Sequence, residues 1–312
     1  MASAPPGSAT TTSAEQAYLD LVARVLERGV RRPNRTGTDT LSLFGEFYRV
    51  DLAEGFPLLT TKRVNFNAMW REVLWYLSGE DHIRTLRRHT RIWDDWADEN
   101  GELETAYGRF WRYYPLPEPG AHVGGEVWAD ITHPDVRRLA STRTLVFDQL
   151  GYVERMLRTD PYSRRLVVSA WHPANAAVSR LPPCHYTFCF NVSPDPEGGP
   201  PRLNCHLTQR SADIALGVPF NLACYALLTQ VLAEGAGMQP GTFAHSLVDA
   251  HVYVNHIDGL QEQLRRTPYP LPQLHFAPCP SGRPRMLDEL RFEDAELVGY
   301  EHHPAIRFPV AV

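Results

Sequence analysis

The stretch SRLPPCHYTFCFNV, residues 179–192, sets Cys184 and His185 side by side at the start of an expected β-strand. Strand-like runs also occupy residues 166–171 and 202–208, and the turn-rich segment SPDPEGGP joins the central run to the latter. The sequence therefore predicts a three-stranded unit with Cys184 at one end. Because neighbouring residues of a strand point to opposite faces, Cys184 and His185 are not expected to act as a nucleophile and its base.

Helical patterns surround this unit. A first helix is expected between Ser13, which opens a capping-box pattern, and Gly29. The segment NFNAMWREVLWYLS, residues 65–78, predicts a largely buried helix that ends at Gly79. Further helices are expected over LGYVERMLR and over FNLACYALLTQVLAEG, which Gly235 ends, and a strand is expected over TLSLFGEFYRVDL.

The composition limits the classes of function. The 312 residues, 43% hydrophobic and 21% charged, suffice to bury a sizeable core, and the net charge of −5 argues against a general nucleic-acid-binding surface. Five cysteines without a C-x-x-C pair suggest neither a disulfide framework nor a zinc site, so a cytoplasmic location fits best. The sequence shows neither a secretory signal nor a run of about 18 apolar residues.

Two segments lack the periodicity of packed elements. Residues 1–12 are mostly small and rich in Pro, Gly, Ser and Thr, so we expect a disordered tail. Residues from about 115 to 143 mix prolines and glycines, so we expect a surface insertion there. The rest of residues 13–312 is expected to form a single catalytic domain.

Residue chemistry alone leaves the role of Cys184 open. A thiol with a pKa of about 8.5 needs cationic neighbours or a base to act as a nucleophile, and a free cysteine is otherwise a buried hydrophobic residue. Glu72 lies in the expected helix 65–78 among Trp, Val and Leu, where a carboxylate is costly unless it is hydrogen-bonded or its pKa is shifted. Both residues are candidates for function.

Arginines and hydroxyl groups form the donor set that a phosphate dianion prefers. They gather in NRTGT at 34–38, in YSRR at 162–165 and in TQRSAD at 208–213. Solvated or salt-bridged arginines are the alternative interpretation of each motif. The sequence therefore allows a phosphate site without requiring one.

Other polar and aromatic groups are equally ambiguous. Asp249, His251 and Tyr253 share one face of an expected strand, as a pocket wall or an exposed surface. Asn221 closes GVPFN, where a plain helix N-cap is favoured, and the aromatic residues of 93–114 favour core packing over stacking on a heterocycle. No Gly-rich phosphate loop, Rossmann fingerprint or HExxH motif occurs, which disfavours NTPases, dehydrogenases and metalloproteases.

Taken together and in order, the motifs resemble those of thymidylate synthase of the folate-dependent, cysteine-using family. From about residue 16 to residue 312, outside the insertion, the shared blocks are NRTGTDTLSLFG, FPLLTTKR, EVLWYLSG, IWDDWADENGEL, YGRFWR, SRRLVVSAW, LPPCH, QRSADIALGVPFN, DAHVYVNH and the terminal PVAV. The resemblance implies an α+β fold with a large mixed β-sheet, helices on one face, and a homodimer that packs sheet against sheet.

The resemblance also implies a reaction, the reductive methylation of dUMP to dTMP. In this family 5,10-methylenetetrahydrofolate is both carbon donor and reductant, no metal takes part, and Cys184 would attack carbon 6 of the uracil. An alternative is a relative that hydroxymethylates dUMP, dCMP or CMP, in which water replaces hydride in the last step. Asn221 favours uracil, because cytidylate-specific relatives typically carry aspartate at that position. A catalytically silent nucleotide-binding or RNA-binding protein on this fold is disfavoured, because the nucleophile and the arginines are retained.

Roles for individual positions follow from the same resemblance. The implied catalytic residues are Cys184, Glu72, Tyr107, Asn221 and Asp213. The implied nucleotide-binding residues are Arg35, Arg210 and Ser211 at the phosphate, Arg164 and Arg165 supplied there by the partner subunit, Asn221 at the uracil edge, Asp213, and His251 and Tyr253 at the sugar. The implied folate-binding residues are Lys62, Asn65, Trp93, Trp96, Asp213, Ala311 and Val312, with Asn65 standing where many members have histidine. The arginines are expected to favour the Cys184 thiolate, and the C-terminus is expected to close over the site.

Overall fold

The structure is a computed structural model that describes residues 13–104, 106–116, 133–174, 178–179 and 181–310. The expected tail at 1–12, most of the expected insertion, and the C-terminal Ala311 and Val312 lie outside the described residues.

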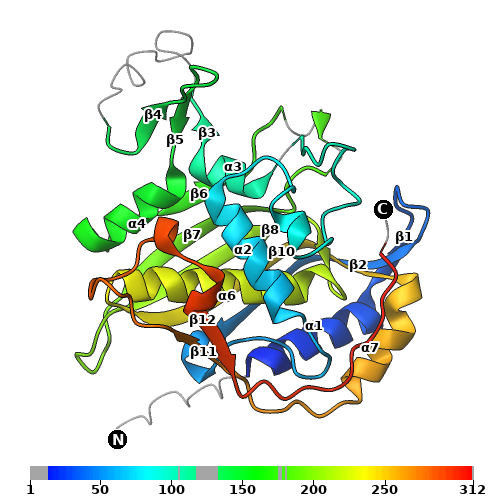
Figure 1. Cartoon of the computed structure of the whole chain (residues 1–312). Helices are drawn as coiled ribbons and strands as arrows, with labels where there is room; N and C mark the ends of the chain where they lie inside the picture. Colours follow the sequence, from blue (N-terminus) through cyan, green and yellow to red (C-terminus); the bar gives the residue numbers. More distant parts are fainter. Residues whose placement is uncertain (1–12, 105, 117–132, 175–177, 180, 311–312) are drawn as a thin grey trace, which may run out of the picture.

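One large sheet of mixed direction organises the described residues (Figure 1). Its strand order is β1-β2-β10-β8-β7-β6, and β9 pairs with β10 beyond the end of β8. The β8 and β9 strands run parallel to β10, whereas the other neighbours are antiparallel. The strands span β1 Val30–Arg32, β2 Thr40–Asp51, β6 Val167–Ser169, β7 His185–Ser193, β8 Arg202–Gln209, β9 Ala212–Asp213 and β10 Gln239–Tyr253.

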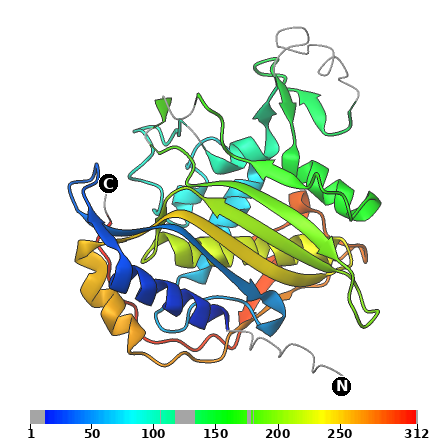
Figure 2. The same ribbon diagram turned by 180° about the vertical axis from the view of Figure 1, so that it is seen from behind.

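The helices pack mainly on one face of this sheet. Figure 1 shows α2 and α6 in front of it, and Figure 2 shows the opposite face without a helix drawn across it. The sequence of α6 is apolar on nearly all sides, and the helix is accordingly buried on nearly all sides. The helices span α1 Ala14–Arg28, α2 Phe66–Ser78, α3 Tyr107–Arg112, α4 Gln149–Thr159, α6 Gly217–Gly235 and α7 Ile257–Leu264, with short 3-10 helices at Leu52–Glu54, Leu86–Arg88, Val254–His256, Leu287–Glu289 and Phe292–Asp294.

Local signals explain where the first two long helices begin and end. The Ser13 hydroxyl accepts a hydrogen bond from the Gln16 amide at 3.2 Å, and Gly29 follows the last residue of α1. Asn65 caps α2 through the Ala68 amide at 3.1 Å, and Gly79 ends that helix in the left-handed conformation. The predicted helices at both places are confirmed, as are the predicted α4 and the three-stranded unit β6-β7-β8.

The predicted start of α6 is wrong. The sequence suggests Asn221 as its N-cap, but the helix begins at Gly217, so Asn221 lies in its second turn. Pro219 is the third residue of α6, where a missing amide hydrogen costs no intrahelical hydrogen bond. The proline therefore belongs to the helix instead of preceding it.

Two small sheets lie outside the main one. The strands β3 Tyr114–Pro115, β5 Leu145–Phe147 and β4 Val136–Arg138 pair in that order, and β11 Gln273–Phe276 pairs with β12 Ala295–Val298. In the first of these sheets, β4 lies within the expected insertion 115–143, β3 lies at its start and β5 just after its end, and the sequence pattern predicts none of these strands. Strands of two or three residues are too short for alternation to be visible.

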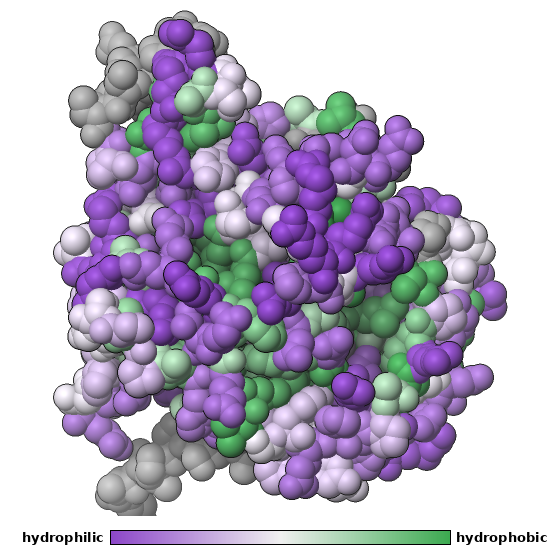
Figure 3. All heavy atoms as spheres, in the orientation of Figure 1, coloured by the Kyte–Doolittle hydropathy of each residue, from purple (hydrophilic) through white to green (hydrophobic). Residues whose placement is uncertain are grey.

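The helical face presents a mainly hydrophilic surface with apolar side chains in its hollows (Figure 3). A groove of about 590 Å³ on this side is lined by α2, by Arg112 and Tyr113, and by residues 287–293. In the described ranges, no helix has both the length and the apolar character that crossing a membrane requires.

Candidate active site

Cys184 immediately precedes β7, and the side chain of Arg210 binds the turn in which it lies. The Arg210 guanidinium donates to the carbonyl oxygens of Pro183 at 3.0 Å and Pro182 at 2.5 Å, and it lies 3.6 Å from the Cys184 sulfur. The Arg210 amide donates to the Cys184 carbonyl at 2.9 Å, and the Cys184 amide donates to the Tyr107 hydroxyl at 2.7 Å. Arginine, tyrosine and cysteine are thus brought together from positions far apart in the sequence.

The thiol of Cys184 is not activated to the extent that its arginines suggest. Burial raises its pKa above the ordinary value, and the charges of Arg210 and Arg35 with a hydrogen bond from Tyr107 lower it only in part. The expectation that the arginines favour the thiolate is right in direction, but desolvation prevails in the protein without ligand.

His185 turns away from this thiol. Its ring stacks on Tyr107 with 3.7 Å between ring centroids and an angle of 1°, and its Nδ1 lies 2.7 Å from the Tyr225 hydroxyl. Burial lowers the pKa of His185 to about 3, so the ring is neutral at physiological pH. The prediction that Cys184 and His185 do not form a nucleophile and base pair agrees with this arrangement.

Glu72 projects from α2 into a buried cluster of donors. Its carboxylate accepts hydrogen bonds from the Trp93 indole at 2.6 Å and from the Cys224 thiol at 3.7 Å. Burial raises the pKa of Glu72, and hydrogen bonds from Trp93, Tyr76 and Cys224 oppose that rise only partly. Glu72 is therefore suited to exchange a proton closer to neutral pH than an exposed glutamate would.

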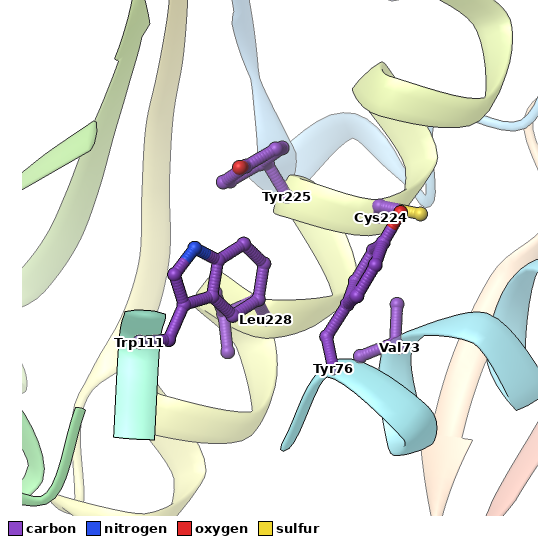
Figure 4. Close-up of a pocket in the computed structure, with 6 residues that line it drawn as sticks. All are labelled: Val73, Tyr76, Trp111, Cys224, Tyr225 and Leu228. Atoms are coloured by element: carbon purple, nitrogen blue, oxygen red, sulfur yellow. The ribbon is translucent and has the colours of Figure 1, made fainter. Parts of the chain in front are cut away.

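A small cavity lies behind this cluster (Figure 4). It measures about 10 Å³, so it holds one water molecule at most. The donors of Glu72 therefore have little free space behind them. The side chains around the cavity come from α2, α3 and α6, and they are Val73, Tyr76, Trp111, Cys224, Tyr225 and Leu228.

Asp213 and Asn221 both lie close to Gly217, the first residue of α6. Asp213 Oδ1 accepts hydrogen bonds from the amides of Ala215 at 2.9 Å and Leu216 at 3.1 Å, and no described residue donates to its Oδ2. A methyl group added to Gly217 would lie 3.6 Å from Asn221 Oδ1 and 3.7 Å from Asp213 Cβ. The side chains of Asp213 and Asn221 thus both lie next to Gly217.

His251 and Tyr253 close the site from β10. Their rings contact edge to face at 5.5 Å, and His251 pairs with Asp213 across the β9-β10 ladder. Burial and Asp213 raise the pKa of Tyr253, whereas Arg35 and a hydrogen bond from Asn34 lower it. Tyr253 is therefore close enough to both the NRTGT loop and Asp213 to sense their charges, and its role at the sugar stays a prediction.

Some predicted residues lie apart from Cys184 or make other contacts. Arg164 and Arg165 are exposed between α4 and β6, and no described contact joins either of them to Cys184. Asn65 is exposed and serves as the N-cap of α2. Lys62 is only 5% exposed. Its Nζ donates to the Ala215 carbonyl and lies over the Phe308 ring at 4.7 Å from the centroid.

The remaining predicted residues lie near the site or outside the described chain. Ser211 follows Arg210 and is partly buried, and its carbonyl oxygen accepts a hydrogen bond from Gln209 at 3.0 Å. Trp96 packs against Trp93 at 5.7 Å between ring centroids. Ala311 and Val312 belong to the undescribed C-terminus, so their expected folate contacts stay predictions.

The sequence analysis missed three polar residues that support the site. Cys224 contacts Glu72, Tyr225 contacts His185, and His256 lies 4.0 Å from Asp213 Oδ1. Helical spacing was an available signal for two of them, because Asn221 lies three and four residues before Cys224 and Tyr225 on α6. His256 carries no comparable local signal.

Two comparisons relate the sequence of this chain to known proteins. The sequence model of the protein family described as thymidylate synthase matches residues 16–312. A curated thymidylate synthase from Haloferax volcanii is 48% identical, over 94% of this chain and 95% of the relative.

Proposed function

The chain belongs to the thymidylate synthase family, and from this premise we propose that it methylates dUMP to dTMP. The reaction needs a nucleophile for carbon 6 of the uracil, cations for the phosphate, and polar groups for the pyrimidine ring. The observation that carries the proposal is the meeting of Cys184 with Arg210, 3.6 Å from the sulfur, and with Tyr107, 2.7 Å from its amide.

Cys184 begins the reaction. Its sulfur adds to carbon 6, the thiol proton is lost, and the electron pair of the carbon 5–carbon 6 bond moves toward carbon 5 and the ring carbonyl. Carbon 5 then becomes the nucleophile that takes the one-carbon unit, so that one difficult bond formation is divided into easier steps. Arg210 and Arg35 stabilise the thiolate that is consumed, because both charges lower the pKa of Cys184.

Two buried groups, Glu72 and Tyr107, take part in the proton transfers of the reaction. Glu72 organises water and proton transfer at the uracil carbonyl, a role that its raised pKa and its donors Trp93 and Cys224 support. Tyr107 assists removal of the proton from carbon 5, since its hydroxyl lies beside the Cys184 backbone. Asn221 pairs with the uracil edge, where its amide satisfies both the ring N–H and a carbonyl oxygen.

The residues present fit the reduced folate that the family uses. Asp213 Oδ2 has no donor within the described chain and is free to accept a hydrogen bond from a pterin N–H. Trp96 is partly exposed and packs against the buried Trp93, whose indole donates to Glu72, so Trp96 offers aromatic surface close to the site. When bound, 5,10-methylenetetrahydrofolate supplies the one-carbon unit and the hydride that completes the methyl group.

A product analysis tests this function. Purified protein with dUMP and methylenetetrahydrofolate should form dTMP and dihydrofolate in equal amounts, seen as a rise in absorbance and by mass spectrometry. The Cys184→Ser variant should form neither. A 5-hydroxymethyl nucleotide with tetrahydrofolate as the second product would refute methylation, and parallel reactions with UMP, dCMP and CMP would identify the preferred base and sugar.

The uncovered face of the sheet supports the proposed homodimer. Its strands carry apolar side chains that would be costly to leave in water, with exposed fractions of 89% for Phe44, 52% for Phe47, 42% for Val167 and 37% for Val248. Two subunits that pack these faces together would bury them, and the exposed Arg164 and Arg165 would reach the partner's phosphate site.

Subunit mixing tests the shared site. Cys184→Ser and Arg165→Ala proteins, each inactive alone, should regain activity when mixed, because one hybrid site combines Cys184 with an intact Arg165 from the other chain. Mixing Cys184→Ser with Glu72→Gln is the matched control, since these residues belong to the same subunit's site and no hybrid site is complete. Absence of rescue in the first mixture, with subunit exchange confirmed, would contradict the shared site.

A further inference from the structure

The last described residues of the chain, 300–310, form a C-terminal strap along α7 (Figure 1). Backbone groups of the strap are held at three points. The His303 amide donates to the Thr60 carbonyl at 2.7 Å, Arg266 donates to the Pro304 carbonyl at 2.7 Å, and His256 bonds the Pro309 carbonyl at 2.7 Å. The strap is therefore fixed as far as Pro309.

Phe308 is the buried anchor of this strap. It is 9% exposed, and its ring lies 5.1 Å from the His256 ring and 4.7 Å from Lys62 Nζ. Gly259 leaves the space for it, because a methyl group added to Gly259 would come within 2.6 Å of the Phe308 ring. Phe308 thus fills a socket built from a cation, an imidazole and a glycine.

His256 lies between the Phe308 socket and Asp213, the proposed pterin-binding carboxylate. The Pro309 carbonyl can only accept a hydrogen bond, so His256 Nε2 must carry the hydrogen of that contact. The other ring nitrogen, Nδ1, is fully buried, has no hydrogen-bond partner among the described residues, and lies 4.0 Å from Asp213 Oδ1. One imidazole therefore binds the strap and lies close to Asp213 without a hydrogen bond to it.

Lys62 connects the Phe308 socket with the turn that carries Asp213. Its Nζ donates to the Ala215 carbonyl, and the Ala215 amide donates to Asp213 Oδ1, so the lysine holds the turn that orients Asp213. The same ammonium group lies over Phe308. Burial lowers the pKa of Lys62 to about 8, in keeping with an ammonium group that has few partners besides these.

We infer that Lys62 is a positioning residue that locks the Phe308 strap onto the Asp213 turn, and that His256 holds the same strap at Pro309. The folate side of the site then has its correct shape only while Phe308 occupies its socket. The inference rests on the proposed function for its consequence in catalysis but not for the physical link itself. The family resemblance implies a contact of Lys62 with the glutamate tail of the folate, and the kinetic test below distinguishes that role from anchoring.

Limited digestion with a carboxypeptidase tests the link without any substrate. The protease must draw several C-terminal residues into its own cleft, so a strap held at Phe308 and Pro309 slows the release of Val312. Phe308→Leu keeps the apolar volume but removes the ring face, and Lys62→Met removes the cation. Each should accelerate release about tenfold, the order expected for one desolvated cation–π contact.

Three further variants separate anchoring from simple destabilisation. His256→Gln keeps a donor for Pro309 and should leave release near the wild-type rate, whereas His256→Leu should accelerate it as Phe308→Leu does. Phe292→Leu breaks the Arg71–Phe292 contact, in which the guanidinium lies 3.6 Å from the ring centroid, and should leave release unchanged. Equal release rates in wild type, Phe308→Leu and Lys62→Met would overturn the proposed link.

Steady-state kinetics tests the consequence for folate. Lys62→Met and Phe308→Leu should both raise KM for methylenetetrahydrofolate about tenfold, with KM for dUMP changed less than twofold. The rise should be the same for folates with one glutamate and with several. A rise confined to polyglutamylated folate in Lys62→Met would show that Lys62 contacts the tail and would overturn its anchoring role. An inactive wild type would refute the proposed function, whereas the digestion result would still stand.

Discussion

Replacing Glu15 with alanine is expected to destabilise the protein by about 4 kcal/mol, although Glu15 lies on the first turn of α1 and outside the site. Its carboxylate is 2% exposed and accepts hydrogen bonds from the amide and the hydroxyl of both Thr60 and Thr61, at 2.6–2.9 Å. These two residues directly precede Lys62. The carboxylate therefore fixes the segment on which the Lys62 anchor depends.

The magnitude follows from what the four donors can do after the carboxylate is removed. The hydroxyl groups of Thr60 and Thr61 can rotate toward other acceptors, but the two amides are fixed by the backbone. A buried donor left without a partner costs about 1–3 kcal/mol, so two amides cost about 2–6 kcal/mol. Glu15→Gln keeps one acceptor oxygen and should cost about half as much as Glu15→Ala.

Urea denaturation at fixed protein concentration measures this cost, because the stability of the proposed dimer would depend on concentration. Glu27→Ala is the matched control: Glu27 lies on the same helix, its side chain is 70% exposed, and its loss should leave the midpoint unchanged. A double-mutant cycle of Glu15→Ala with Thr61→Val should show a coupling of about 1–2 kcal/mol. A cost below about 1 kcal/mol for Glu15→Ala, or no coupling, would refute the reasoning.

Two further predictions follow from the shifted pKa values of Glu72 and Cys184. Burial raises the pKa of Glu72. The protonated carboxyl group therefore contributes stability that is fully present below the ordinary carboxyl pKa, and this stability is lost as the pH rises through the raised pKa. Glu72→Gln should therefore melt at a higher temperature than wild type at neutral pH, and the difference should vanish in acid. Methylation by this variant should be slower by about 10²–10⁴-fold. An equal or lower melting temperature at neutral pH would contradict the stability prediction. Burial also raises the pKa of Cys184, whereas a hydrogen bond with Ser281 lowers the pKa of the solvent-facing Cys279. Alkylation followed by peptide mapping should thus reach its plateau at a higher pH for Cys184 than for Cys279, and the reverse order would show that the arginines outweigh desolvation.

The sequence predicts those elements whose boundaries are set by local chemistry. Ser13 and Gly79 mark helix ends through a cap and a left-handed glycine, and both signals lie within a few residues of what they control. The start of α6 is mispredicted because Pro219 resembles a helix breaker, although the first turn of a helix tolerates proline. The sheet β3-β5-β4 is missed because its strands are too short to show alternation.

Some members of the candidate site are predictable from the sequence, but their contacts are not. The family resemblance assigns Cys184, Tyr107 and Arg210, and the fold brings these three together. The contacts of His256 with Pro309 and of Lys62 with Phe308 join segments far apart in the sequence, so no local pattern announces them. The net pKa shift of Cys184 is unpredictable for a related reason, because burial depends on how the whole chain packs around the thiol.

Covalent attack by Cys184 is the central claim, and one mass measurement tests it most directly. With 5-fluoro-dUMP and methylenetetrahydrofolate, the reaction should stop after the adduct forms, because fluorine at carbon 5 cannot leave as the proton does. Intact-protein mass spectrometry should then show one nucleotide and one folate added per chain, and peptide mapping should place them on Cys184, with no adduct in Cys184→Ser. An adduct on another cysteine, or dTMP formation from dUMP by Cys184→Ser, would contradict the claim.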